Sequence, residues 1–342
     1  MKRLALWGLA MAVPLALALA GAEAFYRSYA AAKTLYQYDA SLGWRPIPNF
    51  TYQGRRRDSG GARYPVAVTT NEHGFRAWGN PTTDRARVLF VGDSFTADLN
   101  MSDADAYFGQ VADQLDAEVF AVGAGGYGTL QELMLVEAHA PIIAPHILVL
   151  QFCANDLANN SFAIESASIV RNQKNLRPYW QDGAIIYRLA DHHWYKVLYR
   201  NFALFRFFDQ QLQNIQYRRY GGYRDPAYPP PTRTQRREAD VITEQLFKTL
   251  VATTPTATDH LTFATCNLRH RGQTERWTRI ANNAGFTPLP QVGLAVDDAA
   301  KTDPSVLAAD GAHWAPRGHA IAGATLAKAL AEPVARANNA GT

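Results

Sequence analysis

Four short segments of the chain carry groups that could act together on an acyl group. They are residues 92–95 (GDSF), 123–128 (GAGGYG), 153–156 (CAND) and 310–313 (DGAH). They supply a hydroxyl, backbone N–H groups on a glycine turn, a carboxamide, and a carboxylate three residues before an imidazole. Acyl transfer through a serine requires a hydroxyl nucleophile, a base, a group that orients the base, and donors for the oxyanion. The four segments therefore contain every part that this chemistry needs.

Apolar runs and helical patterns alternate along the chain and predict the elements that position these segments. Short apolar runs bounded by glycine or polar residues are typical of buried parallel strands. The strand-like runs are residues 87–92, 118–122, 146–152 and 260–265, and helical spacing occurs at 104–115, 130–140, 242–251 and 320–330. This alternation predicts a three-layer α/β/α domain, with a flavodoxin-like parallel sheet of about five strands in the order 2-1-3-4-5. Such sheets bind ligands at the carboxyl ends of their strands, where the first three segments lie.

Taken in order, the four segments resemble the sequence blocks of the SGNH (GDSL-type) hydrolase family. The resemblance covers roughly residues 70–335. It implies that Ser94 is the nucleophile, His313 its general base and Asp310 the group that orients the imidazole. This agrees with the chemistry, because a serine hydroxyl is a weak nucleophile unless a base takes its proton during the attack.

The resemblance also implies an oxyanion hole formed by the N–H groups of Ser94 and Gly126 and by the side-chain amide of Asn155. Two positions depart from the family pattern. Cys153 stands where the third block has glycine, and Ala121 stands where the second block commonly begins with asparagine. Neither departure removes a catalytic group.

The implied activity is serine-dependent hydrolysis of carboxylic esters through an acyl-serine, without a cofactor or a metal. O-acylated carbohydrates and other envelope esters are the candidate substrates. An O-acyltransferase would use the same triad, and a non-catalytic envelope assembly protein would keep it as a vestige, so both stay open. Residues 123–128 also fit the dinucleotide fingerprint G-x-G-x-x-G. That fingerprint normally follows the first strand of its unit, whereas a strand already precedes this one.

The N-terminus indicates export from the cytoplasm. Lys2 and Arg3 precede an apolar run over residues 4–22. This run is longer than the roughly 7–15 apolar residues of a signal peptide and close to the roughly 20 of a spanning helix. We therefore expect residues 1–24 to form a transmembrane signal anchor in the inner membrane, with the catalytic domain in the periplasm or exterior. A signal peptide that is cleaved, leaving a secreted protein, is the alternative.

Composition shifts divide the rest of the chain. Residues 25–80 are rich in Gly, Pro, Tyr and Arg and predict a stalk or covering segment, and residues 81–335 form the expected hydrolase domain. An aromatic-rich insertion at residues 159–240 interrupts that domain and is too long to be structureless. Export permits a disulfide between Cys153 and Cys266. Its formation stays open, because it requires the third and fourth strands to be neighbours.

The composition excludes several classes of protein. The chain has 342 residues, of which 47% are hydrophobic and 19% charged, so it is neither disordered nor a coiled coil. The formal net charge is +4 without a dense basic stripe, which argues against nucleic-acid binding. Two cysteines are too few for a Cys-based zinc site. The expected partners are an ester-bearing substrate and the membrane.

Overall fold

The computed structural model of the chain describes most of its residues and separates them into two compact units. The described residues are 2–31, 35–97, 99–167, 177–188, 198, 201–220, 231–266 and 271–340. The first unit comprises Met1–Thr34, Ser166–Leu176 and Leu189–Pro230, and the second comprises Leu35–Glu165, Arg177–Arg188 and Pro231–Thr342. Much of the expected insertion at 159–240, namely 168–176, 189–197, 199–200 and 221–230, lies outside the described residues.

The first unit contains two long helices, α1 (Lys2–Ala31) and α8 (Ala203–Tyr220). The Glu23 carboxylate accepts the N–H groups of Ala203 and Leu204, each at 2.8 Å, and so caps the start of α8. The apolar run at 4–22 lies inside α1. Within the described ranges, however, no helix combines the length and the hydropathy that crossing a bilayer demands, so the expected transmembrane helix is not found.

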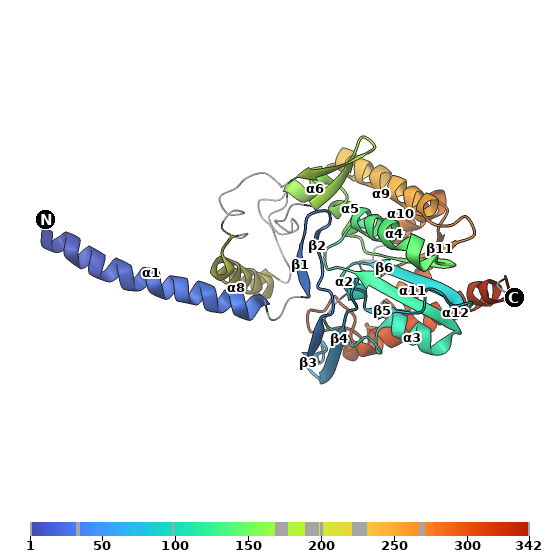
Figure 1. The fold of residues 1–342 in the computed structure, drawn as a ribbon, viewed down its shortest axis with the longest axis horizontal. Helices are drawn as coiled ribbons and strands as arrows, with labels where there is room; N and C mark the ends of the chain where they lie inside the picture. The colour runs from blue at the N-terminus through green and yellow to red at the C-terminus, as the bar shows by residue number, and fades with distance from the viewer. Residues whose placement is uncertain are drawn as a thin grey trace. The chain divides into compact units, whose positions relative to one another are not determined.

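The second unit is built on a sheet of six strands in the order β12-β11-β8-β6-β7-β5. Figure 1 labels β5, β6 and β11 of this sheet. The strands are β5 (Ala77–Trp78), β6 (Ala86–Gly92), β7 (Ala117–Gly123), β8 (Ile147–Phe152), β11 (Asp259–Ala264) and β12 (Thr287–Pro288). All neighbours pair in parallel except β5, which lies antiparallel to β7. The prediction of an α/β fold with a mostly parallel sheet is confirmed. When the parallel strands are numbered along the chain, their order across the sheet is 2-1-3-4-5. The sequence did not predict the antiparallel β5, because its two residues are too few to show a period.

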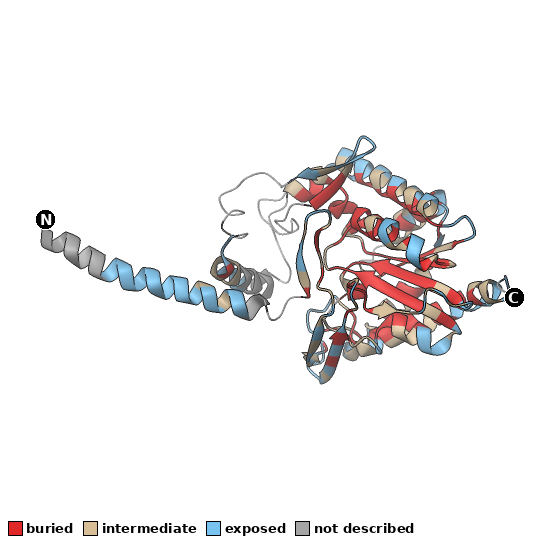
Figure 2. Cartoon of the chain, in the orientation of Figure 1, coloured by how far each residue is buried: buried red, intermediate tan, exposed pale blue. Residues whose placement is uncertain are grey.

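Both faces of the sheet are buried, which explains why its strands read as continuous apolar runs. In β6, Val88 and Phe90 belong to one apolar cluster, and Leu89 and Val91 belong to the other. Figure 2 shows the resulting buried band through the middle of the second unit. The sheet is therefore the rigid base from which the ends of β6, β7, β8 and β11 project.

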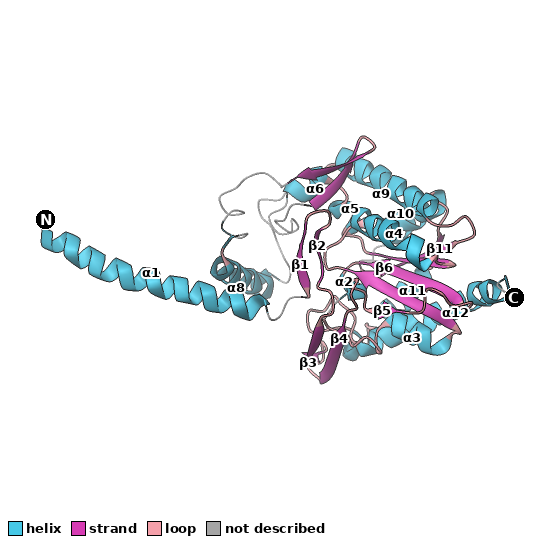
Figure 3. Ribbon diagram, in the orientation of Figure 1, coloured by secondary structure: helices cyan, strands magenta, loops and turns pink. Residues whose placement is uncertain are grey.

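Helices cover both faces of the sheet, as Figure 3 shows. Helices α4, α9 and α10 contribute to one apolar cluster, and α3, α11 and α12 contribute to the other. The helices are α2 (Ser94–Ala97), α3 (Tyr107–Gln114), α4 (Thr129–Ile143), α5 (Asp156–Asn159), α6 (Phe162–Ala167), α9 (Arg233–Thr253), α10 (Arg271–Asn283), α11 (Pro290–Ala299) and α12 (Pro316–Ala340), with a 3₁₀ turn at Pro304–Val306.

Residues 35–80 of the expected covering segment fold as part of the second unit. They form two antiparallel hairpins before β5. The first joins β1 (Tyr36–Asp39) to β2 (Gly43–Pro46), and the second joins β3 (Thr51–Arg57) to β4 (Arg63–Thr69).

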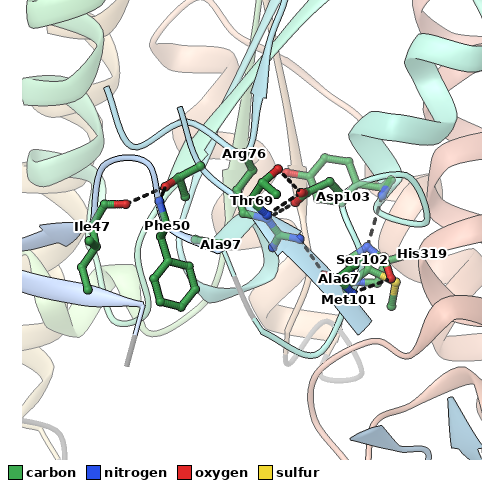
Figure 4. A network of polar contacts seen from close by, with 12 residues as sticks. Ile47, Phe50, Ala67, Thr69, Arg76, Ala97, Met101, Ser102, Asp103 and His319 are labelled. Carbon is green, nitrogen blue, oxygen red and sulfur yellow. Dashed lines mark hydrogen bonds and ion pairs between the residues drawn. The ribbon is translucent and has the colours of Figure 1, made fainter. Parts of the chain in front are cut away.

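A network of polar contacts ties this segment to the loop after α2 (Figure 4). The buried Arg76 donates from Nε to a carboxylate oxygen of Asp103 and from Nη2 to the Met101 carbonyl, both at 2.6 Å. The other carboxylate oxygen of Asp103 accepts the N–H of Thr69 at 2.7 Å. The covering segment is therefore fixed next to the end of β6.

A third hairpin lies within the expected insertion. It joins β9 (Arg177–Gln181) to β10 (Ala184–Arg188) and belongs to the second unit. Asp182 and Gly183 form its turn with φ values of 52° and 82°. Two consecutive positive φ values in a two-residue turn match the right-handed twist of the strands, and Asp-Gly is a favoured pair there.

Candidate active site

Ser94 is the first residue of α2, directly after the turn that ends β6. Asp93 builds that turn, because its carboxylate accepts the N–H of Phe95 at 3.0 Å and its carbonyl accepts the N–H of Ala97 at 3.1 Å. The serine therefore lies at the carboxyl edge of the sheet, on a short and well-fixed turn.

His313 and Asp310 reach Ser94 from the loop that precedes α12. Nε2 of His313 lies 2.8 Å from Oγ of Ser94, and Nδ1 of His313 lies 2.6 Å from Oδ2 of Asp310. The loop is fixed by backbone hydrogen bonds from Ala308 N–H to the His313 carbonyl and from Ala315 N–H to the Val306 carbonyl. The structure thus brings together the three residues that the sequence predicted as a triad.

The environment of Asp310 keeps its carboxylate ionised. Partial burial alone would raise its pKa, but the hydrogen bond and positive charge of His313 and the N–H groups of Ala312 and His313 outweigh this and lower the pKa to about 2. An ionised Asp310 accepts a hydrogen bond from Nδ1 of His313 when that nitrogen carries the proton. The Nε2 lone pair of His313 is then directed at the Ser94 hydroxyl.

Asn155 follows β8 and immediately precedes α5. Its side chain hydrogen-bonds the carboxyl of Asp93, the neighbour of Ser94. Its Oδ1 lies 3.7 Å from Sγ of Cys266. This is a sulfur–oxygen contact, because Cys266 is disulfide-bonded and has no proton to donate. The structure therefore places the predicted amide next to the turn that carries the serine.

The two cysteines form the disulfide that the sequence left open. Cys153 follows β8 and Cys266 follows β11, and the two strands are paired in parallel. The Cα atoms lie 5.2 Å apart, within the usual range for a disulfide. The bond cross-links the carboxyl ends of two neighbouring strands beside Asn155.

Gly126 lies in the loop between β7 and α4, with a φ of +77° that favours glycine. Its carbonyl accepts hydrogen bonds from Asn159 Nδ2 and Arg177 Nη2, both at 3.2 Å. The preceding carbonyl, of Gly125, accepts the indole N–H of Trp44 at 3.0 Å. Because the peptide between Gly125 and Gly126 is trans, the Gly126 N–H points away from Trp44.

Tyr36 links the Gly126 loop to the helix that carries the serine. Its hydroxyl accepts the N–H of Gly125 at 2.7 Å and lies 3.4 Å from the carbonyl of Ala97, the last residue of α2. The sequence analysis missed Tyr36, Trp44 and Arg177. They lie in the short hairpin strands β1, β2 and β9, whose sequences show no clear period, so the residues themselves carried no signal of these contacts.

A layer of buried polar groups lies behind the triad. Burial raises the pKa of Asp93, although the hydrogen bonds from Phe95, Gln151 and Asn155 oppose this. Burial, together with the nearby Asp93 carboxyl, raises the pKa of Glu132 well above its ordinary value. In the described part of the chain neither carboxyl oxygen of Glu132 has a hydrogen-bond partner.

Asp156 belongs to the same layer. Burial raises its pKa strongly, and the carboxyls of Glu132 and Asp93 add to the effect. Its Oδ2 accepts the N–H of Cys153 at 3.1 Å, which braces the turn before Asn155. Although the layer contains several carboxyls, no group of His, Cys, Asp or Glu among the described residues is arranged to hold a metal ion.

Comparison with known proteins gives structural likenesses at low sequence identity. No protein-family model and no curated protein sequence matches the chain. Similar solved structures include LAE5, an alpha/beta hydrolase enzyme from the metagenome of Lake Arreo in Spain (13% identity, 75% of this chain and 96% of that chain, TM-score 0.39). They also include a lipase/acylhydrolase from Enterococcus faecalis (16%, 72% and 95%, 0.39) and a catalytic mutant of Axe2, an acetylxylan esterase from Geobacillus stearothermophilus (13%, 71% and 93%, 0.39). These TM-scores lie below 0.5, so a function for this chain has to be inferred from the geometry of the site itself.

Proposed function

We propose that this chain is a serine esterase of the SGNH (GDSL-type) family, which hydrolyses carboxylic esters through an acyl-serine intermediate. The observation that carries the proposal is the continuous path from Ser94 through His313 to Asp310. Its two contacts measure 2.8 Å and 2.6 Å, and Ser94 and His313 are 219 positions apart in the sequence. A hydroxyl, an imidazole and an ionised carboxylate in this order form a nucleophile, a base and an orienting group.

The first half of the reaction transfers the acyl group to the enzyme. Oγ of Ser94 attacks the ester carbonyl carbon while Nε2 of His313 takes the hydroxyl proton. Asp310 stabilises the imidazolium without becoming protonated, in keeping with its pKa of about 2. The tetrahedral intermediate then collapses, and the alcohol leaves with the proton from Nε2. Water attacks the acyl-serine by the same sequence of proton transfers and releases the carboxylic acid.

The developing oxyanion requires donors opposite the serine. We assign this role to the N–H groups of Ser94 and Gly126 and to the side-chain amide of Asn155. The Asn155 side chain is held beside Asp93, and its NH₂ group has two hydrogens, so it can serve the Asp93 carboxyl and an acyl oxygen at once. The fixed orientation of the Gly125 carbonyl supports the assignment of Gly126.

The contacts of residues 123–128 disfavour dinucleotide binding. In that class of protein the loop after the strand presents free N–H groups to a pyrophosphate. Here the Gly125 N–H donates to the Tyr36 hydroxyl, and the Trp44 indole occupies the Gly125 carbonyl. The hairpin of β1 and β2 thus occupies the Gly125 N–H, one of the donors that a pyrophosphate would need.

We also propose that the catalytic domain works outside the cytoplasm. The Cys153–Cys266 disulfide supports this location, because such bonds form and persist in oxidising compartments and are rare in the cytosol.

The experiment that tests the proposed function is labelling by a fluorophosphonate, combined with assays on p-nitrophenyl esters of increasing acyl length. We expect the full chain to be labelled at Ser94 and to release p-nitrophenol. The Ser94→Ala variant should show neither, with a loss of about 10⁶-fold in kcat. Adding sugar acceptors measures whether the acyl group goes to water or to a hydroxyl. Unchanged hydrolysis by Ser94→Ala protein would refute the assignment.

A further inference from the structure

We propose that Arg177, contributed by the β9–β10 hairpin of the insertion, is a positioning residue that holds Gly126 as an oxyanion donor. This inference rests on the proposed function and extends it to a residue outside the four sequence segments. It assigns the hairpin a specific task in the reaction: fixing the loop between β7 and α4.

Arg177 makes an extensive set of contacts for a single side chain. Its Nη2 donates to the Gly126 carbonyl at 3.2 Å and to Oε1 of Gln131 at 2.6 Å. Its Nη1 donates to Oε1 of Glu165 at 3.2 Å. The guanidinium also lies over the Trp44 ring, 5.3 Å from its centre. One planar group therefore joins the Gly126 loop, the helix α4 that follows it, the helix α6 and the β1–β2 hairpin.

The burial of this ion pair argues against a role in packing alone. Arg177 is 1% exposed and Glu165 is 0% exposed. Charged residues are rarely buried to this degree, and a buried ion pair is often no more stabilising than apolar side chains of similar volume. An apolar pair would fill the space equally well but would leave the Gly126 carbonyl with Asn159 Nδ2 as the remaining donor of the two described.

Arg177 acts on both peptide groups that flank the Cα atom of Gly126. The carbonyl after this Cα atom accepts the guanidinium directly. The peptide before it is fixed by the Trp44 indole, and the guanidinium packs against that ring. Glycine at a φ of +77° has wide rotational freedom, so an unclamped Gly126 could turn its N–H away from the serine. Fixing both peptides removes that freedom before the substrate arrives, as electrostatic preorganisation requires.

Arg177→Lys is the informative substitution, because it keeps the positive charge and removes the planar fork. A lysine ammonium cannot bridge Gly126, Gln131 and Glu165 with the same geometry. Losing one oxyanion donor typically lowers kcat by about 10²–10³-fold, and a loosened donor should cost less. We expect Arg177→Lys to lower kcat by about 10–100-fold with KM nearly unchanged, because the oxyanion forms only after the substrate has bound.

The experiment compares kcat, KM and inhibition by a trifluoromethyl ketone, which forms a tetrahedral adduct with the serine. The ketone should bind Arg177→Lys more weakly by the same factor as kcat falls. Arg188→Lys is the matched control, because Arg188 is an exposed residue on the same hairpin. Its kcat and ketone affinity should stay within about twofold of wild type. An unchanged kcat in Arg177→Lys, or a lower kcat with unchanged ketone affinity, would overturn the proposal.

Two further measurements keep the inference testable if Arg177→Lys folds poorly or the wild type is inert towards esters. Trp44→Phe removes the indole donor while keeping a ring, and it should reduce kcat and ketone affinity in parallel. Amide hydrogen exchange of residues 123–129 reads the loop without any substrate, and Arg177→Lys should accelerate it. Inert wild-type protein with accelerated exchange in the variant would reject the esterase activity alone. Unaltered exchange in well-folded Arg177→Lys would reject the role of Arg177.

Discussion

Carboxyl groups on the solvent side and on the buried side of the sheet's carboxyl edge have pKa values shifted in opposite directions. On the solvent side, Asp310 has a side chain that is 46% exposed, accepts several N–H groups and has a pKa of about 2. On the buried side, Glu132 is 0% exposed, and burial beside Asp93 raises its pKa well above the ordinary value. Burial therefore favours the neutral form of the Glu132 carboxyl, whereas the hydrogen bonds and the charge around Asp310 favour its anion. The number of donors and the access of water decide which form is stable.

This difference in pKa suggests different functions for the carboxyls on the two sides. An anion next to His313 can stabilise the imidazolium that forms during the proposed reaction. Burial raises the pKa of the carboxyls behind Ser94 and Asn155, which favours their neutral form and so reduces the negative charge near the proposed oxyanion. We therefore expect substitutions on the solvent side to change the rate of the reaction, and substitutions on the buried side to change the stability of the fold.

The largest effect is expected for Asp310→Asn. The amide has nearly the same shape but cannot serve as a purely accepting partner for Nδ1 of His313, so the imidazole loses the tautomer that accepts the serine proton. We expect kcat to fall about 10⁴-fold. Thermal unfolding should shift little, because a substitution on a partly exposed loop rarely changes stability strongly. A variant that keeps kcat within tenfold of wild type would place Asp310 outside the mechanism.

Asn155→Ala should have an intermediate effect, because Asn155 lies between the two sides. The variant loses one proposed oxyanion donor and one hydrogen bond to Asp93. We expect kcat to fall about 10²–10³-fold with little change in KM. Steady-state kinetics on a p-nitrophenyl ester measures this. A loss confined to KM would show that Asn155 binds the substrate and does not stabilise the transition state.

Glu132→Gln should have the smallest effect on activity, and its effect on stability should depend on pH. The folded-state pKa of Glu132 is raised, so its favourable contribution is complete below the unfolded-state pKa and is lost as pH rises towards the folded-state pKa. Glutamine does not titrate. The variant should therefore gain stability over wild type with rising pH above about 4.5, by up to about 1.4 kcal/mol per pH unit.

Urea unfolding of both proteins at pH 5 and pH 8 measures this gain. A stability difference that stays constant between the two pH values would mean that Glu132 titrates normally in the folded protein.

The sequence predicted the parts of the site that depend on regular elements. Buried strands give apolar runs and their ends are readable, so Ser94 and Asn155 could be assigned to one edge of a parallel sheet. The support of the Gly126 loop was not predictable in this way. Trp44 and Arg177 contact the loop from 81 and 51 positions away in the sequence, and such long-range contacts leave no periodic pattern.

The burial of Glu132 and the character of the N-terminal helix were also not predictable from the sequence patterns. Glu132 lies in α4 like any polar helix residue, and only the packing of that helix shows it to be buried. The apolar run at residues 4–22 suggested a spanning helix by its length. Among the described residues, however, no helix has both the length and the hydropathy of a membrane span.

The β1–β2 hairpin has a consequence for how much of the chain the proposed activity needs. A shortened chain that begins near residue 81 would lose β5 but would still contain the five parallel strands, Ser94, His313 and Asp310. Such a shortened protein would lack Tyr36 and Trp44, and with them the side chains that hold Gly125. The smallest working unit is therefore larger than the layered sheet. A recombinant version intended for activity should begin before residue 35.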